Sequence, residues 1–158
     1  MDGSLDTTFD SDGIVLQPIN QGAYINSIAI QEDGKIVAGG AMNNEVYNMF
    51  TLTRYNTNGT PDNTFDSDNL VITDMGSYAV INSIAIQSDG MIVAGGYSSP
   101  YPKQVFTLAR YSTSGAQDTS FSTGIQGFVT TEIGTYSIIN SIAIQSDGKI
   151  LAGGHSNL

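Results

Sequence analysis

Short runs in which apolar side chains alternate with small or polar ones recur along the chain. In residues 25–31, Ile28 and Ile30 share one parity, and Ser27 and Ala29 share the other. This alternation has the period of a β-strand, and small residues on the second face predict a strand that is buried on both sides. No stretch shows a sustained helical period. The pattern therefore predicts an all-β chain.

Turn signals follow these runs and divide the pattern into four strands. An Asp-Gly turn at 32–34 follows the first predicted strand, and this dipeptide strongly favours a hairpin. The return strand, 35–40, ends in two glycines, where we expect a bulge or a close backbone approach. Two more strands are predicted, at 50–55 and at 14–16. Counterparts of the strand at 14–16 occur at 70–72 and 128–130.

The first two strands belong to a segment that occurs three times. Residues 25–40, 81–96 and 139–154 are identical at 13 of 16 positions, with spacings of 56 and then 58 residues. A fixed period in this range is typical of repeat architectures. Four strands per period favour the blade of a β-propeller. A solenoid of stacked β-coils is the alternative, although Asp-Gly hairpins favour antiparallel meanders.

Two further motifs repeat with the same period. Gly-x-x-Asp-x-Ser/Thr-Phe begins at Gly3, Gly59 and Gly115. Phe-Thr-Leu-x-Arg-Tyr occurs at 50–55, and with the same spacing at 106–111. We therefore interpret residues 1–158 as a single repeat domain, a β-propeller of about three four-stranded blades with the last incomplete. The repeat units span about 3–58, 59–114 and 115–158.

Composition excludes several classes of function. Charged residues are only 13% of the chain and the net charge is −10, which argues against nucleic-acid binding because phosphates need a basic surface. The absence of cysteine excludes disulfides and thiolate metal sites. No apolar run approaches the roughly 18 residues of a membrane span, and residues 1–6 lack the features of a signal peptide. The acidic balance favours solubility over a dedicated binding face.

The three motifs, in this order and spacing, resemble the delta-60 repeat family of bacterial β-propeller-like repeats. The resemblance covers nearly the whole chain and rests on Ser-Ile-Ala-Ile-Gln-x-Asp-Gly-Lys-Ile-x-Ala-Gly-Gly and on the two shorter motifs. It implies a propeller fold in a bacterial protein that is extracellular or at the cell surface. It implies no catalytic or binding residues. The chain departs from the family pattern in having too few blades.

One arginine per repeat lies on the apolar face of a predicted strand. Arg54 shares the face of Phe50 and Leu52, and Arg110 takes the same place in the next repeat. A buried charge needs a partner, and the aspartate of Gly-x-x-Asp is the nearest candidate. Recurrence in each repeat favours a structural role over ligand binding. The predicted structural residues are Arg54, Arg110, Asp6, Asp62 and Asp118, with the turn glycines Gly34, Gly90 and Gly148.

Metal sites have little support in the sequence. Asp10, Asp12, Asp66 and Asp68 resemble the start of two calcium loops, but the distal glutamate of such a loop is missing. They are weak calcium candidates, and turn formation is favoured; no other cofactor is expected. The single histidine, His155, has no second imidazole or thiolate beside it for a transition metal, and we expect it in a surface loop.

Tyrosines in the loops after the second strand are the candidate ligand-binding residues. Tyr47, Tyr97 and Tyr101 lie among asparagine, serine and proline, which suits contact with a glycan or a protein. Ordinary drift between repeats is the favoured explanation for these loops. A second set of tyrosines precedes the first strand of each repeat and is expected to pack: Tyr24, Tyr78 and Tyr136.

The order of the predicted strands points to assembly. The chain starts with a fourth strand and stops after a second one, and fewer than three blades cannot close a ring. We expect a non-enzymatic structural module that assembles with itself into a closed ring or a filament, the strand at 14–16 of one copy pairing with the last hairpin of another. One alternative is a piece of a longer propeller, with the remaining blades as partners. Another is a glycan- or protein-binding module. An enzyme is disfavoured because the inner strands carry isoleucine, alanine, serine and asparagine.

Overall fold

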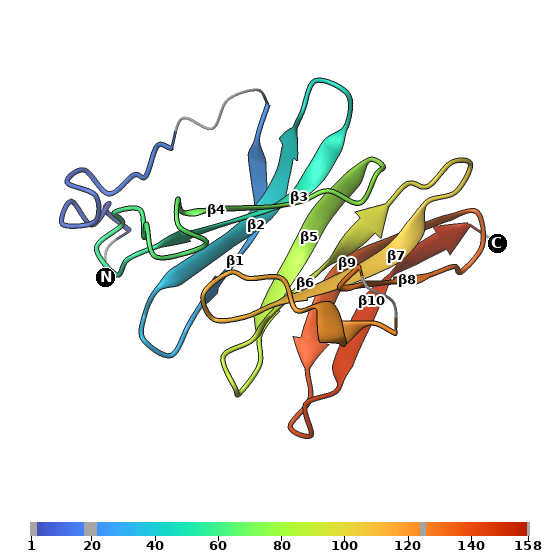
Figure 1. The fold of residues 1–158 in the computed structure, drawn as a ribbon. Helices are drawn as coiled ribbons and strands as arrows, with labels where there is room; N and C mark the ends of the chain where they lie inside the picture. Colours follow the sequence, from blue (N-terminus) through green and yellow to red (C-terminus); the bar gives the residue numbers. More distant parts are fainter. Residues whose placement is uncertain (1–2, 18–21, 124–125, 158) are drawn as a thin grey trace.

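The computed structural model describes residues 3–17, 22–123 and 126–157, which form three antiparallel sheets in succession (Figure 1). The first sheet comprises β1 (Tyr24–Ile30), β2 (Ile36–Asn43), β3 (Asn48–Tyr55) and β4 (Leu70–Thr73). The second comprises β5 (Ala79–Ile86), β6 (Ile92–Ser98), β7 (Val105–Tyr111) and β8 (Phe128–Thr131). The third comprises β9 (Tyr136–Ile144) and β10 (Ile150–Asn157). A short 3-10 helix, η1 (Thr119–Phe121), precedes β8.

Each four-stranded sheet is a meander, because its strands pair in the order in which the chain makes them. This arrangement confirms the prediction of an all-β fold built from propeller-like, four-stranded blades. We call the three sheets blade 1, blade 2 and blade 3. Blade 3 has two strands, β9 and β10, in the described residues.

The blades pack face to face along the chain (Figure 1). β5 packs against β1, β2 and β3, and β9 packs against β5, β6 and β7. The first strands β1, β5 and β9 therefore contact one another in turn, as the inner strands of a propeller do. The core consists of apolar side chains on the blade faces, together with Phe65 from the loop between β3 and β4. The largest on the blade faces include Phe50, Leu52, Ile81, Ile92, Tyr111 and Ile139. No helix among the described residues is long and apolar enough to cross a membrane.

The paired glycines of the second strand mark a close backbone approach. β1 carries a bulge between Ile25 and Ser27, opposite Gly39 and Gly40. A methyl group on Gly40 would lie 1.9 Å from the carbonyl oxygen of Tyr24, so a larger residue would force the two strands apart. The same bulge recurs in blades 2 and 3. The bulge predicted from the two glycines is therefore confirmed.

The prediction of a strand at 14–16 is wrong, because these residues form no ladder. Its counterparts do form strands, and both β4 and β8 pair with the third strand of their own blade. Within the described residues no third strand lies beside 14–16. The backbone of an extended segment needs such a neighbour for its hydrogen bonds.

The first strands differ in how far they are buried. β5 lies between blades 1 and 3 and is covered on both sides, as the sequence predicts. β1 is covered on one side only, and Ile28 and Ile30 are exposed. The prediction of burial on both sides is therefore wrong for β1, because no blade packs on its second side within the described residues.

Candidate functional site

The predicted Asp-Gly turns form in all three blades. Their glycines, Gly34, Gly90 and Gly148, have a φ of +82°, a region in which glycine is strongly favoured. Each glycine nitrogen donates to the carbonyl of a glutamine three residues before it, at 2.9 Å. The turns thus serve the hairpins of the scaffold.

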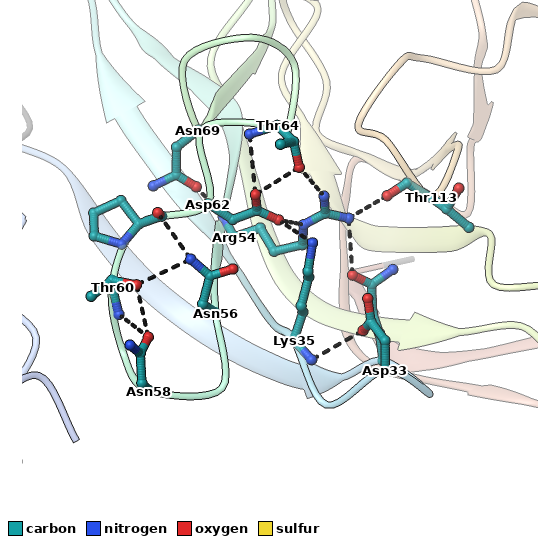
Figure 2. A network of polar contacts seen from close by, with 12 residues as sticks. Asp33, Lys35, Arg54, Asn56, Asn58, Thr60, Asp62, Thr64, Asn69 and Thr113 are labelled. Carbon is teal, nitrogen blue, oxygen red and sulfur yellow. Dashed lines mark hydrogen bonds and ion pairs between the residues drawn. The ribbon is translucent and has the colours of Figure 1, made fainter. Parts of the chain in front are cut away.

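The arginine of blade 1 is enclosed by partners from two repeats (Figure 2). Arg54 Nε donates to Asp62 Oδ2 at 2.8 Å. Its Nη1 donates to Gln31 Oε1 at 3.2 Å and to the carbonyl of Thr113, which follows β7 of blade 2. The guanidinium carbon lies 4.6 Å from the centre of the Phe65 ring. The pairing of Arg54 with Asp62 expected from the sequence forms, and the arginine also ties blade 1 to blade 2.

Asp62 has two further donors. Lys35 Nζ donates to Asp62 Oδ2 at 2.8 Å, and Thr64 donates from its nitrogen and its Oγ1 to Oδ1, at 3.1 and 2.6 Å. Burial opposes the charged carboxylate, but these hydrogen bonds and the charge of Arg54 hold the pKa of Asp62 well below its usual value. The side chains of Arg54 and Asp62 are only 7% and 5% exposed, so this is a buried ion pair in which each charge needs the other.

Acid is expected to destabilise the protein through Asp62. Because the pKa of Asp62 is lower in the folded chain than in the unfolded one, its stabilisation is present above the unfolded-state pKa of about 3.9 and is lost as the pH falls below about 4. Asp62→Asn should lower the free energy of unfolding at neutral pH. In acid, the free energy of unfolding of this variant should decrease less steeply than that of the wild type. Urea unfolding at a series of pH values measures both effects. Asp66→Asn, in an exposed turn, is the control. Equal acid slopes for the wild type and Asp62→Asn would refute this role.

The equivalent arginine of blade 2 has fewer partners. Arg110 Nε donates to Asp118 Oδ2 at 2.8 Å, and the guanidinium carbon lies 4.8 Å from the centre of the Phe121 ring. Met91 stands where blade 1 has Lys35, so Asp118 lacks the second cation. The Arg110 side chain is 25% exposed. The arginine–aspartate pair therefore recurs in blade 2, where its side chains are more exposed to solvent than those of Arg54 and Asp62.

Within the described residues, two polar groups lack the arginine partner that their counterparts have in blade 1. The Gln87 Oε1 atom, the counterpart of the Gln31 acceptor, is buried and has no hydrogen-bond partner there. Asp6 accepts from the nitrogen and the Oγ1 of Thr8, at 3.0 and 2.6 Å, and no arginine of the described chain bonds to it. The pairing of Asp6 with an arginine that the sequence predicts does not form within the described residues.

Each blade is joined to the next through the same two polar side chains. Asn26 Nδ2 donates to the Ile81 carbonyl at 2.9 Å, and Ser27 Oγ accepts from the Ile84 nitrogen at 3.0 Å. Both bonds recur between blades 2 and 3, at 2.9 and 3.1 Å, through Asn82 to Ile139 and Ser83 from Ile142. The asparagine and serine of one first strand thus bind the backbone of the next first strand.

Apolar contacts between the blades repeat as regularly. The space over Gly39 is filled by Ile84 of the next blade, whose Cγ2 would lie 2.8 Å from a methyl group on that glycine. In the same way, Ile142 Cγ2 would lie 2.6 Å from a methyl group on Gly95. At Gly153 of blade 3 the nearest atom would be 4.0 Å away, so this space is open. Each blade therefore offers glycines on one side and isoleucines on the other.

The outer side of blade 1 carries the isoleucine half of this interface. Ile28 is 66% exposed, whereas its counterparts Ile84 and Ile142 are 7% and 8% exposed. We call this surface of β1 the head face and define it by Ile25, Ile28 and Ile30, all of which are exposed. It offers the apolar side chains that fill the space over a glycine in the two internal interfaces.

The outer side of blade 3 carries the receiving half. We call it the tail face and define it by Asn140, Ser141, Leu151 and Gly153, all of which are exposed. Leu151 takes the ladder position of Val37 and Val93, which are fully buried. The tail face thus holds the asparagine, the serine and the open glycine that receive the next blade inside the molecule.

The three candidate ligand-binding tyrosines do not gather at one site. The Tyr47 hydroxyl donates to both carboxylate oxygens of Asp74, at 3.0 and 3.1 Å. Tyr97 lies within β6 and not in the loop after it, and its ring stacks on that of Tyr78 with centres 6.2 Å apart. Tyr101 is 98% exposed. This dispersal provides no single platform for a glycan.

Other tyrosines do come together. Asn48 Nδ2 donates to the hydroxyls of Tyr24 and Tyr78, at 3.0 and 2.7 Å. Burial, with the nearby Tyr78 and Tyr24, raises the pKa of Tyr97 to about 12. Tyr24 takes the ladder position of Val80, so it is not the register equivalent of Tyr78. The two meet because they approach Asn48 from neighbouring blades.

The calcium candidates serve the turns of the chain. Asp12 and Asp68 each accept through Oδ1 from the backbone nitrogen two residues ahead, at 2.9 and 3.0 Å. Asp10 and Asp66 adopt a φ of +46° and +48°, which suits the short polar side chain of aspartate in a turn. No group of three or more histidine, aspartate or glutamate side chains that could hold a metal occurs in the described residues. His155 lies in β10 and not in a loop, with Nδ1 3.4 Å from Asn140 Nδ2.

Sequence reasoning missed the residues that join the blades. The signal was present, since the Asn-Ser pair is identical in all three copies of the repeat. Such identity at small polar positions indicates a repeated contact rather than drift. The roles of Lys35 and Phe65 were also missed, because both depend on how the loop after β3 folds back over Arg54.

Two segments of the chain, residues 31–65 and 87–121, match the family model described as domain of unknown function (DUF5122) beta-propeller. The matched segments contain both arginine–aspartate pairs, Arg54 with Asp62 and Arg110 with Asp118. The chain matches no curated protein sequence at a significant level. The match and the blades of the fold both support a β-propeller-like architecture built from repeats.

Proposed function

We propose that this chain of β-propeller-like repeats is a non-enzymatic structural module that assembles with itself through its blade faces. The observation that carries the proposal is the match between the outer faces and the internal interfaces. The head face holds the isoleucines, and the tail face holds the glycine, the asparagine and the serine, that meet twice inside the molecule. A second copy can therefore offer each face the partner that it has within the chain.

The energetic argument rests on the apolar half of the contact. Full burial of an isoleucine side chain contributes about 1.5–3 kcal/mol, and the head face exposes three of them. The contact is heterologous, because the head face of one copy meets the tail face of another. Such contacts close into a ring where the rotation allows and otherwise grow into a filament.

The remaining elements of the proposal follow from the sequence and from the use that the chain makes of its polar groups. The three motifs support the narrower assignment to delta-60 repeats and, with it, an extracellular or cell-surface location in a bacterium. A non-enzymatic role is supported by the arginine–aspartate pairs, whose hydrogen bonds are committed to holding loops and blades together. The asparagine and serine pairs are committed in the same way.

Ile28→Asp is expected to weaken self-association by about 10-fold or more, because an aspartate at the centre of the head face would have to be desolvated where an isoleucine should be buried. Sedimentation equilibrium over a range of protein concentrations measures the change. Val46→Asp is the matched control, since Val46 is 80% exposed in the loop after β2 and lies outside both faces. Equal association by the two variants would rule out the head face.

A further inference from the structure

A groove of about 600 Å³ lies beside the head face. It is lined by residues 15–17, residues 23–25 and Tyr55. Leu16 is 82% exposed there, and Ile25 of the head face is also exposed. The groove therefore places an apolar surface between the N-terminal segment and the first strand of blade 1.

The N-terminal segment adopts the fold of its counterpart in the next repeat. Asp10 and Ser11 have φ values of +46° and +71°, and Asp66 and Ser67 have +48° and +70°. The chain then turns back in both, with Gly13 donating to the Phe9 carbonyl at 2.7 Å and Asn69 donating to the Phe65 carbonyl at 2.8 Å. Residues 9–13 thus take the shape that leads into the fourth strand of a blade.

This segment also docks on blade 1 as its counterpart docks on blade 2. The Asp10 nitrogen donates to the Asn58 carbonyl at 2.8 Å, and the Asp66 nitrogen donates to the Ser114 carbonyl at 2.9 Å. The Tyr55 hydroxyl donates to Gln17 Oε1 at 2.6 Å. Thr73 and Tyr111 are the counterparts of Gln17 and Tyr55 in the next repeat, and their hydroxyls are hydrogen bonded to each other at 2.7 Å. Residues 9–17 therefore occupy the position of the outer segment of a blade that would precede blade 1.

The groove corresponds to the third strand of that preceding blade, because residues 15–17 take the place of 71–73, which pair with β3. In blade 1 the fourth strand is joined through β3 and β2 to β1, and this sheet covers β5 of the next blade. In the preceding blade, the first and second strands would therefore lie on the head face beside the groove. They would carry the glycine, asparagine and serine that receive Ile25 and Ile28.

We propose that the β9–β10 hairpin of a second copy docks on the head face beside this groove, so that one blade is built from two copies. The inference rests on the proposed self-association and specifies its register. Asn140 Nδ2 is placed to donate to the Ile25 carbonyl, and Ser141 Oγ to accept from the Ile28 nitrogen, as their counterparts do in both internal interfaces. The Ile28 side chain then fills the open space over Gly153.

The same docking brings a free strand edge to the groove. In the described residues β10 pairs only with β9, whereas β2 and β6 each pair with a third strand on their other side. That edge of β10 faces the groove of the first copy, across which residues 14–16 lie in the place of a fourth strand. The groove therefore holds the place of a third strand in the composite blade.

Cysteine cross-linking tests the register, because the chain has no cysteine of its own. Ser141→Cys and Ile28→Cys are made in separate chains, mixed and oxidised, and the products are separated by mass. The expected result is a disulfide between the two different variants. The double variant Ser83→Cys/Ile142→Cys is the positive control, since Ser83 Oγ lies 3.1 Å from the Ile142 nitrogen within one chain. Disulfides only between identical variants, or none between chains that do associate, would overturn the composite blade and leave self-association standing.

Two substitutions on the tail face test the docking itself. Leu151→Asp and Gly153→Ala are each expected to weaken association by about 10-fold without loss of monomer stability, because both sites are open in the single chain. Val46→Asp is again the control. Association of both variants at wild-type strength would overturn the proposed site, whereas a wild type that never associates would overturn the proposed function with it.

Discussion

Arg54→Ala is expected to lower the free energy of unfolding by about 3 kcal/mol, because it leaves the buried carboxylate of Asp62 without the more deeply buried of its two cations. Asp62 would keep Lys35 and Thr64 as donors, but Gln31 Oε1 and the Thr113 carbonyl would lose theirs. The contact of the Arg54 guanidinium with the Phe65 ring would be lost as well. Urea unfolding at neutral pH, followed by circular dichroism, measures the loss.

Arg110→Ala is the matched control for this prediction. The two arginines occupy the same position in successive repeats, but Arg110 is more exposed and forms no bond to a following repeat in the described residues. We expect a loss of about 1 kcal/mol, in the range of partly hydrated ion pairs. Equal losses for the two variants would show that the contact of Arg54 with blade 2 contributes nothing.

Gly96→Ala is expected to destabilise the chain by about 3 kcal/mol, at the upper end for an overpacked site. The added methyl group would lie 1.9 Å from the Val80 carbonyl oxygen, an atom of the backbone that cannot move without opening the β5–β6 pairing. The bulge of β5 would have to rearrange, and Ile81, which is fully buried beside it, would shift as well. Thermal or urea unfolding of the purified variant measures this effect.

Gly153→Ala adds the same methyl group at a site with open space above it. Its stability should stay within about 0.5 kcal/mol of the wild type when measured at a concentration at which copies do not associate. A large loss for Gly153→Ala, or none for Gly96→Ala, would contradict the steric account of the paired glycines.

The sequence predicted those parts of the fold that depend on neighbours along the chain. Alternation in 25–31, the Asp-Gly turn that follows and the Gly-Gly pair are local signals, and the hairpin and its bulge formed where they indicated. The partner of Arg54 could also be predicted, because a charge on an apolar face needs a counter-charge and Asp62 lies a few residues away.

Predictions that depended on distant neighbours failed. Residues 14–16 have the composition of the fourth strand, yet a strand requires a third strand beside it, which alternation cannot reveal. The tyrosines were grouped by the loop that carries them, whereas Asn48 and the register of β1 decide which of them meet. The head and tail faces became visible only when the exposure of Ile28 could be compared with that of its buried counterparts.

The two outer blade faces carry the two halves of the internal interface, so the chain should associate with itself. Absolute mass in solution tests this expectation most directly. Light scattering across a concentration series should give a mass that rises above the 16.7 kDa of one chain, and Ile28→Asp should bring it back to that value. A wild-type mass that stays at 16.7 kDa at every concentration would contradict self-assembly through the blade faces.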